Sequence, residues 1–216
     1  MRTIGRSYLL PLACLVAGLA GAYHCFPAGQ QLPTFGKDTV LVWEIRNQEL
    51  TSQFVVRIAE FLPDRFVEWE DDTTQGTIFM PNRAVIGAKA FVNARLFEAG
   101  VDTKGKNATT LWLSQQIYRD LKDKKRIKFA LDSIEGWMTL EGGEKIKVEV
   151  NRTPMELPVI KVKDDRGSER WFLDSEENPL LVKHAIRQFC QILASITTDR
   201  SNTLRWIKGK KLTNPH

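Results

Sequence analysis

The stretch PVIKVKDDRGSERWFLDSEENPLLVKH, residues 158–184, decides the fold of this chain. It alternates two short runs of branched and aromatic residues, PVIKVK (158–163) and RWFL (170–173), with sequences rich in Asp, Gly, Asn and Pro. Runs of this length, bounded by such turn residues, are typical of β-strands. The stretch therefore predicts consecutive strands joined by turns at 164–167 and 174–179.

The same pattern continues on both sides of this stretch. Turns are predicted at 71–76 and 142–143, residues 101–108 are predicted to be a loop, and residues 84–97 fit either a strand or a helix. Alternating apolar and polar residues between the turns predict a meander of antiparallel strands. The runs are TVLVWEIR (39–46), SQFVVRIAEFL (52–62), FVEWE (66–70), TIFMP (77–81), RIKFALD (126–132), GWMTL (136–140) and KIKVEV (145–150).

One segment, TTLWLSQQIYRDLKDKK (109–125), contains the spacing of a helix. Ser114 is a suitable N-cap, Ile117 and Leu121 lie one turn apart, and a cluster of Lys and Arg suits the C-terminal end. Together with the strands, this segment predicts a mainly β fold of the β-rich α+β type. It would hold an antiparallel sheet of many strands and one short helix near 115–124.

The segment after Pro179 fits two structures. The apolar positions between 182 and 196 match a helical stripe, with Asn178 as N-cap and Pro179 as the first helical residue. LLVKHAIR (180–187) and FCQILASITT (189–198) are also each plausible strands.

The order of WLSQQIYRDL (112–121), a β-rich stretch and LPVIKVKDDRGSERWFLDSEENPLLVK (157–183) resembles a group of exported bacterial proteins of unassigned function. Their shared pattern is W-x-L-D-x-x-x-N-P-L after a β-rich body, and the resemblance covers about residues 110–198. It implies that the sheet continues after Pro179, with residues 189–198 as a further strand. It supplies no active site.

The N-terminus has the features of a signal peptide over residues 1–22. Arg2 and Arg6 form a basic start, residues 8–22 carry no charge, and residues 20–22 form an A-x-A cleavage site. The uncharged run is shorter than the roughly 20 residues that cross a bilayer. Export with cleavage is therefore predicted, with an uncleaved membrane anchor or lipid attachment at Cys14 or Cys25 as alternatives.

Composition divides the rest of the chain into a linker, a domain and a tail. Residues 23–38 hold two prolines and two glycines and are predicted to be a linker, followed by a single β-rich domain over 39–199 and a basic tail over 200–216. The whole chain has a net charge of +5, but residues 23–199 hold 24 Lys and Arg against 26 Asp and Glu, a net charge of −2. A nucleic-acid-binding face is therefore not expected.

Residues that carry out catalysis are sparse. The chain lacks G-x-S-x-G, H-E-x-x-H, C-x-x-C, P-loop and G-x-G-x-x-G motifs, and no cofactor or metal is expected. Of three histidines, His24 lies in the predicted linker and His216 ends the chain, which leaves His184 in the domain. A hydrolase would need His184 as a general base with a carboxylate such as Asp174.

Two acidic clusters are predicted to be structural. Glu68 and Glu70 alternate with apolar residues on one run and are followed by Asp71 and Asp72. Carboxylates that alternate on a strand share one face, so a Ca²⁺ site is conceivable, but a solvated face is the expected role. Residues 174–178 are expected to form a solvent-exposed connection without a ligand.

Two further features suggest partners. Cys25 and Cys190 are candidates for a disulfide in an oxidising compartment, but the sequence favours a buried Cys190 and an unpaired Cys25. A basic patch is a candidate contact for anionic lipid head groups or acidic envelope polymers. The basic patch consists of Lys122, Lys124, Lys125, Arg126 and Lys128.

These observations predict an exported, non-enzymatic protein of the periplasm or cell envelope with a binding or structural role. Its expected partner is a lipid, an acidic envelope polymer or another envelope protein. The alternative is a periplasmic hydrolase that uses His184 with a nearby carboxylate.

Export can be tested directly. When the protein is expressed with its own N-terminus in a bacterium, we expect it outside the inner membrane with Tyr23 as its first residue, because signal peptidase cleaves after the A-x-A sequence. Cell fractionation followed by an intact-mass measurement checks this. A cytoplasmic protein that retains Met1 would contradict the prediction.

Overall fold

A computed structural model describes residues 32–93, 102–104 and 107–198. Several sequence predictions concern residues outside these ranges. These are the signal peptide (1–22), the linker before residue 32, Cys25 and the basic tail (200–216).

The compact unit of the chain begins at Leu32. The ring of Phe35 is buried and stacks on Phe61, with ring centroids 6.1 Å apart. Residues 32–38, which were predicted to be part of the linker, therefore pack onto the domain.

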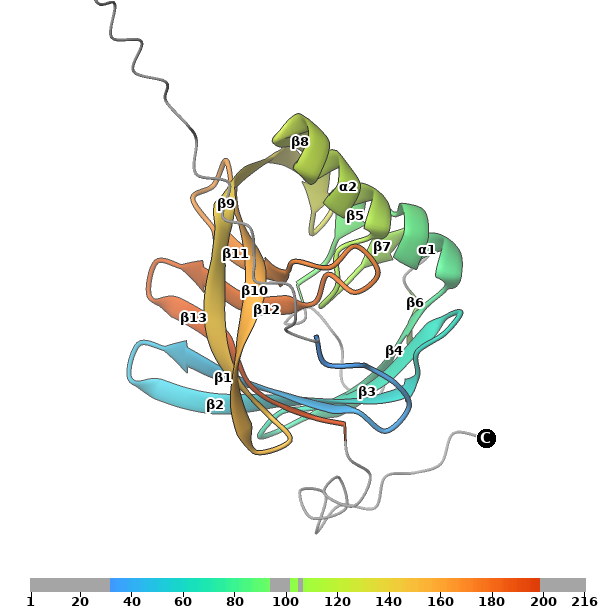
Figure 1. Cartoon of the computed structure of the whole chain (residues 1–216), viewed down its shortest axis with the longest axis vertical. Coiled ribbons are helices and arrows are strands. Elements are labelled where there is room, and N and C mark those ends of the chain that lie inside the picture. Colours follow the sequence, from blue (N-terminus) through green and yellow to red (C-terminus); the bar gives the residue numbers. More distant parts are fainter. Residues whose placement is uncertain (1–31, 94–101, 105–106, 199–216) are drawn as a thin grey trace, which may run out of the picture. The chain divides into compact units, whose positions relative to one another are not determined.

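The described residues form thirteen strands in one sheet, so the predicted mainly β fold is confirmed (Figure 1). Branched and aromatic residues dominate the longer strands, as expected from the fit of such side chains to a pleated surface. The bounds are β1 Val40–Asn47, β2 Leu50–Glu60, β3 Arg65–Glu70, β4 Gln75–Met80, β5 Ala90–Phe91, β6 Asp102–Lys104, β7 Ala108–Thr109, β8 Arg126–Leu131, β9 Ile134–Val150, β10 Thr153–Asp164, β11 Glu169–Leu173, β12 Leu181–Ile186 and β13 Phe189–Thr197.

The strand order is β6-β4-β3-β2-β1-β13-β12-β11-β10-β9-β8-β5-β7. Consecutive strands from β1 to β4 and from β8 to β13 pair antiparallel, which confirms the predicted meander. The strands β5, β6 and β7 are short and make parallel contacts: β6 with β4, and β5 with both β7 and β8.

The last strand, β13, joins the two ends of the meander. It pairs antiparallel with both β12 and β1, and Thr197 lies opposite Val40. Its C-terminal residues also run parallel to the end of β9, with Ser195 opposite Glu149. The strands β9 to β13 therefore form a closed ring, and β1 continues the sheet from that ring.

The strand β9 runs without interruption through residues 142–143, so the turn predicted there is wrong. The register between β9 and β10 shifts once, next to Val162, because Glu141 is an extra residue on β9. A β-bulge of this kind bends a strand without ending it. The two predicted runs on either side of the glycines are therefore one strand.

Both faces of the β10–β11 pair are buried under apolar side chains. On one face, Val159 and Leu173 belong to the first core, which is formed mainly by β1 to β4 and β9 to β13. On the other face, Ile160, Val162 and Phe172 belong to the second core, which is formed mainly by β8 to β11 and a helix. The same two strands thus separate and stabilise two hydrophobic cores.

The helix of the second core is α2 (Gln115–Lys124), and its prediction is confirmed. The hydroxyl of Ser114 accepts the amide N–H of Ile117 at 3.1 Å, as an N-cap does. Ile117, Tyr118 and Leu121 are buried toward β8 and β9.

Two local predictions in the middle of the chain needed correction. A second short helix, α1 (Asn82–Gly87), precedes β5, so the ambiguous residues 84–93 divide between helix and strand. The loop predicted at 101–108 contains β6 and the start of β7. These strands are two or three residues long, and such lengths carry too few positions to show a period of two.

The segment after Pro179 forms β12 and β13, so the strand prediction is confirmed and the helical alternative is wrong. Leu180 and Val182 belong to the first core. Leu181 points the other way but enters the second core rather than solvent. The apolar run is continuous because both sides of this segment are buried.

The core position of Leu180 gives a stability prediction. Leu180→Ala is expected to lower the free energy of unfolding by about 2–5 kcal/mol, because the side chain is fully buried and its removal leaves a cavity. Replacing Glu176 and Glu177 together by Gln should cost less than about 1 kcal/mol, since both side chains are exposed. Urea unfolding of the two variants checks this, and a larger loss in the Gln double variant would contradict it.

Candidate functional site

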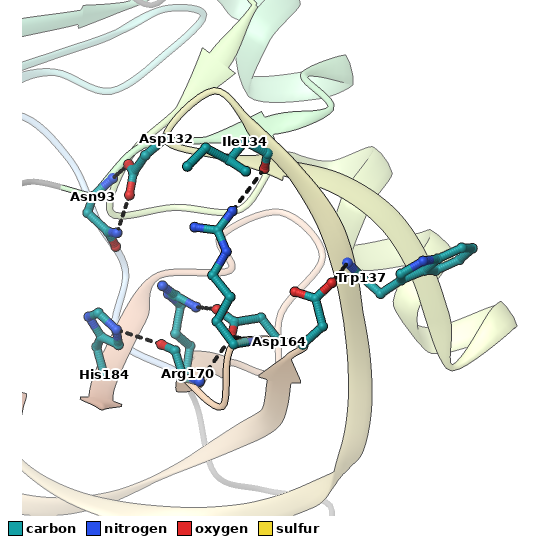
Figure 2. Close-up of polar contacts among 10 residues, drawn as sticks. Asn93, Asp132, Ile134, Trp137, Asp164, Arg170 and His184 are labelled. Atoms are coloured by element: carbon teal, nitrogen blue, oxygen red, sulfur yellow. Dashed lines mark hydrogen bonds and ion pairs between the residues drawn. The ribbon is translucent and has the colours of Figure 1, made fainter. Parts of the chain in front are cut away.

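His184, the histidine of the domain, lies in a buried polar cluster at the β10–β11 turn (Figure 2). Its Nε2 and the hydroxyl oxygen of Ser168 share a hydrogen bond of 2.8 Å. The ring also meets that of Phe189 edge-on, with centroids 5.2 Å apart. The sequence prediction did not include Ser168, because the two residues are brought together by the pairing of β11 with β12.

The cluster is organised by Asp164, the last residue of β10. Its Oδ1 accepts the backbone N–H groups of Arg166 at 3.0 Å and Ser168 at 2.9 Å, which fixes the turn. Its Oδ2 accepts Nη1 of Arg170 at 2.8 Å, and both side chains of this ion pair are buried. Burial lowers the pKa of Arg170, and the hydrogen bond and charge of Asp164 oppose that shift.

A serine hydroxyl bonded to an imidazole is the first requirement of nucleophilic catalysis. Ser168, however, is only 2% exposed, and His184 is also buried. A substrate carbonyl could not approach the hydroxyl oxygen in this arrangement. The hydrogen bond instead satisfies two buried polar side chains, as the interior of a protein requires.

Asp174, the proposed partner of His184, is held by α2 instead. Its carboxylate accepts Nζ of Lys122 at 2.9 Å and also the hydroxyl of Tyr118. Burial, followed by the hydrogen bond to Asp174, raises the pKa of Tyr118. Asp174 therefore attaches α2 to the β11–β12 connection.

The β11–β12 connection is less exposed than predicted. Asn178 is buried, and its side-chain oxygen accepts the indole N–H of Trp112 at 2.6 Å. The backbone oxygen of Glu177 accepts Nη2 of Arg65 at 3.1 Å. The solvent-exposed description is correct for Glu176 and Glu177 but wrong for Asn178.

The acidic cluster on β3 is only partly a solvated face. Glu68 is buried and accepts Nε of Arg57 at 2.7 Å, so the prediction is wrong for this residue. Asp71 caps the β3–β4 turn by accepting the backbone N–H groups of Thr73 and Thr74. The carboxylate of Glu68 thus binds a guanidinium, and that of Asp71 binds backbone N–H groups.

Three of the five cations in the basic patch form ion pairs. Lys122 pairs with Asp174, Lys124 pairs with Asp120, and Lys128 pairs with Glu135. The remaining two, Lys125 and Arg126, lie between these at the junction of α2 and β8. The Nζ of Lys125 donates to the backbone oxygen of Lys122 at 2.7 Å, and Arg126 contacts an aromatic ring.

That ring belongs to Trp137 of β9, which was not predicted to be a site residue. The guanidinium carbon of Arg126 lies 4.6 Å from the ring centroid, and 43% of Trp137 is exposed. Figure 2 shows the indole directed away from Asp164 and His184. The alternation in GWMTL places Trp137 and Met138 on opposite faces of the strand, and Met138 is fully buried.

Ile134 is 58% exposed in the same β8–β9 hairpin, and Lys128 lies directly opposite Trp137. Ile134 lies opposite Leu131 and therefore on the other face of the hairpin. We refer to Arg126, Lys128 and Trp137 as the aromatic–cation face. An exposed indole and two cations are thus presented together on neighbouring strands.

Cys190 is a half-buried cysteine on β13, opposite Arg46 of β1. Its proposed partner, Cys25, lies outside the described residues. The disulfide stays a prediction.

No family model, curated protein or solved structure matched this chain. Within residues 32–93, 102–104 and 107–198, no helix is long and apolar enough to cross a membrane. The same residues contain no group of three or more His, Cys, Asp or Glu that could hold a metal ion.

The buried ion pair provides a second stability test. Asp164→Asn is expected to lower the free energy of unfolding by about 3–5 kcal/mol, because it leaves the buried charge of Arg170 uncompensated. Asp165→Asn is the matched control: the next residue is exposed, and the change should cost less than about 1 kcal/mol. Denaturant unfolding measures both, and equal losses would show that Asp164 has no special role.

Proposed function

We propose that this protein is an exported, non-enzymatic component of the cell envelope that binds an anionic lipid surface through its aromatic–cation face. The observation that carries the proposal is the guanidinium of Arg126 stacked on the half-exposed indole of Trp137. Export is supported by the basic start and the uncharged run of residues 8–22 with its A-x-A end.

The stacked pair has the chemistry of a lipid–water boundary. A tryptophan has an apolar body and one polar N–H group, and such side chains concentrate at the level of lipid head groups. A guanidinium that lies over a ring still presents N–H groups at its edge, which can bind a phosphate with two hydrogen bonds. Trp137 would enter the apolar side of the boundary while Arg126 contacts the head group.

Neighbouring residues add charge. Nη2 of Arg166 donates to the backbone oxygen of Ile134 at 3.4 Å, which brings a further cation to this hairpin. Each cation near an anionic membrane contributes about 1 kcal/mol. The Lys128–Glu135 pair is exposed on both sides, so it holds Lys128 only weakly.

A non-enzymatic role is supported by the burial of the Ser168–His184 pair. A hydrolase needs a nucleophile that the substrate can reach, and these side chains face the interior. Asp174, the carboxylate named as an example in the hydrolase alternative, already contacts Tyr118 and Lys122.

Vesicle binding tests the proposal. The chain from Tyr23 onward should co-sediment with vesicles that contain phosphatidylglycerol and much less with phosphatidylcholine vesicles, because cations must be attracted to the surface. Trp137→Ala and Arg126→Ala should each weaken binding by about 1 kcal/mol, roughly fivefold.

Two changes of the same kind elsewhere on the surface serve as controls. Leu50→Ala removes an exposed apolar side chain from β2, and Arg46→Ala removes an exposed guanidinium from β1. Neither should alter binding. If all four variants bind like the unchanged protein, or if neutral vesicles bind equally well, the aromatic–cation face is not the contact.

A further inference from the structure

Arg65, at the start of β3, is a buried cation held between two aromatic rings. Its guanidinium carbon lies 4.8 Å from the ring centroid of Phe61 and 4.8 Å from that of Trp112. Only 2% of the residue is exposed. Cation–π contacts on its faces stabilise the charge but leave its edge of N–H groups free to donate hydrogen bonds.

That edge is mostly unused. Nη2 donates to the backbone oxygen of Glu177, whereas Nε and Nη1 of Arg65 are buried without a hydrogen-bond partner among the described residues. Burial lowers the pKa of Arg65 to about 9, and no carboxylate among the described residues counteracts the shift. The group therefore remains charged at neutral pH, and its Nε and Nη1 face no acceptor in the described part of the chain.

The other fully buried arginine shows how this fold treats such a charge. Arg170 is equally buried, but Oδ2 of Asp164 lies 2.8 Å from its Nη1. The backbone N–H of Ser168 donates to Oδ1 of Asp164 and holds that carboxylate in place. A buried charge without a counter-ion costs several kcal/mol, so proteins usually place an opposite charge beside it. Within the part of the chain that the structure describes, Arg65 has no such partner.

The surroundings of Arg65 are fixed by contacts that do not use its free donors. Asn178 holds Trp112 by the indole N–H, and Phe61 is held by stacking on Phe35. Leu62, next to Phe61, is 78% exposed, and Glu177 is exposed on the other side. Arg65 therefore lies beneath two surface connections, β2–β3 and β11–β12, rather than at the centre of the domain.

We propose that Arg65 is the anchor of an oxyanion-binding site, which takes the carboxylate or phosphate group of a small ligand between the β2–β3 and β11–β12 connections. A carboxylate or phosphate would supply acceptors for Nε and Nη1 and a negative charge for the guanidinium. The two rings hold the plane of the guanidinium in one orientation, so that its donors are in place when the β2–β3 and β11–β12 connections part to admit the ligand.

The full chain tests this site by thermal unfolding in increasing concentrations of inorganic phosphate, acetate or octanoate, with sodium chloride keeping ionic strength constant. A ligand that binds the folded state raises the melting temperature in a saturable way. We expect saturation with at least one of the three ligands. Phosphate or acetate would identify a free small oxyanion, and octanoate alone would identify a carboxylate that carries an apolar chain.

The response should depend on the guanidinium of Arg65. Arg65→Met should abolish it, and Arg65→Lys should weaken the affinity at least tenfold, because an ammonium keeps the charge but loses the planar set of donors. Arg152→Met is the matched control, since Arg152 is exposed on the β9–β10 turn, and it should respond like the unchanged protein.

If no ligand gives a saturable rise, or if Arg65→Met responds like the unchanged protein, the proposal is wrong and Arg65 is a buried cation stabilised by its rings alone. If both Arg65 variants fail to fold, ¹⁵N NMR of the unchanged protein decides. The Nε–H resonance of Arg65 should then shift with phosphate, acetate or octanoate, and a resonance that stays in place overturns the site.

Discussion

The burial of β10 and β11 on both faces is the constraint on which the rest of the domain depends. Val159 and Leu173 face one core, and Ile160 and Phe172 face the other, so neither core exists without this pair of strands. Burying one such side chain contributes about 1.5–3 kcal/mol. The other strands continue the sheet from this pair, and α2 covers its second face. The short uninterrupted apolar runs of these strands, at 157–160 and 171–173, lie where both faces are buried, whereas Lys163 farther along β10 is exposed.

Polar side chains at the ends of the same strands complete the packing. Asp164 ends β10 and accepts hydrogen bonds from the backbone of its own turn and from Arg170. Asn178 precedes β12 and accepts the indole N–H of Trp112. In each case a turn residue reaches into the interior and satisfies a group that would otherwise be buried without a partner. Arg65 differs from these groups, because its interior position is supported by aromatic rings and a single backbone oxygen.

The strands and α2 followed from the sequence because their signals are local: an apolar alternation, a turn sequence, or a Ser114 cap within one helical turn. The features that the sequence did not predict depend on distant partners. In the sequence alone, Arg65 resembles a solvated residue at the end of a strand. Its neighbours in the fold, Glu177 and Trp112, are distant in the sequence, and Glu177 is 112 residues away. The continuous β9 was missed because a glycine pair is compatible with either a turn or a bulge. Trp137 was visible in an alternating run, but its exposure depends on which face the helix covers.

The pairing of β1 with β13 determines when the domain can be completed. A polypeptide that emerges N-terminus first forms β1 about 140 residues before β13 is available. Until then one edge of β1 presents unpaired N–H and C=O groups, and such an edge can recruit strands from other chains. Contacts between residues so far apart also form slowly. When the nine-residue strand β13 forms, it pairs with the open edge of β1 and closes the ring against β9. Its pairing therefore ends the interval in which the exposed edge of β1 makes the chain prone to aggregate.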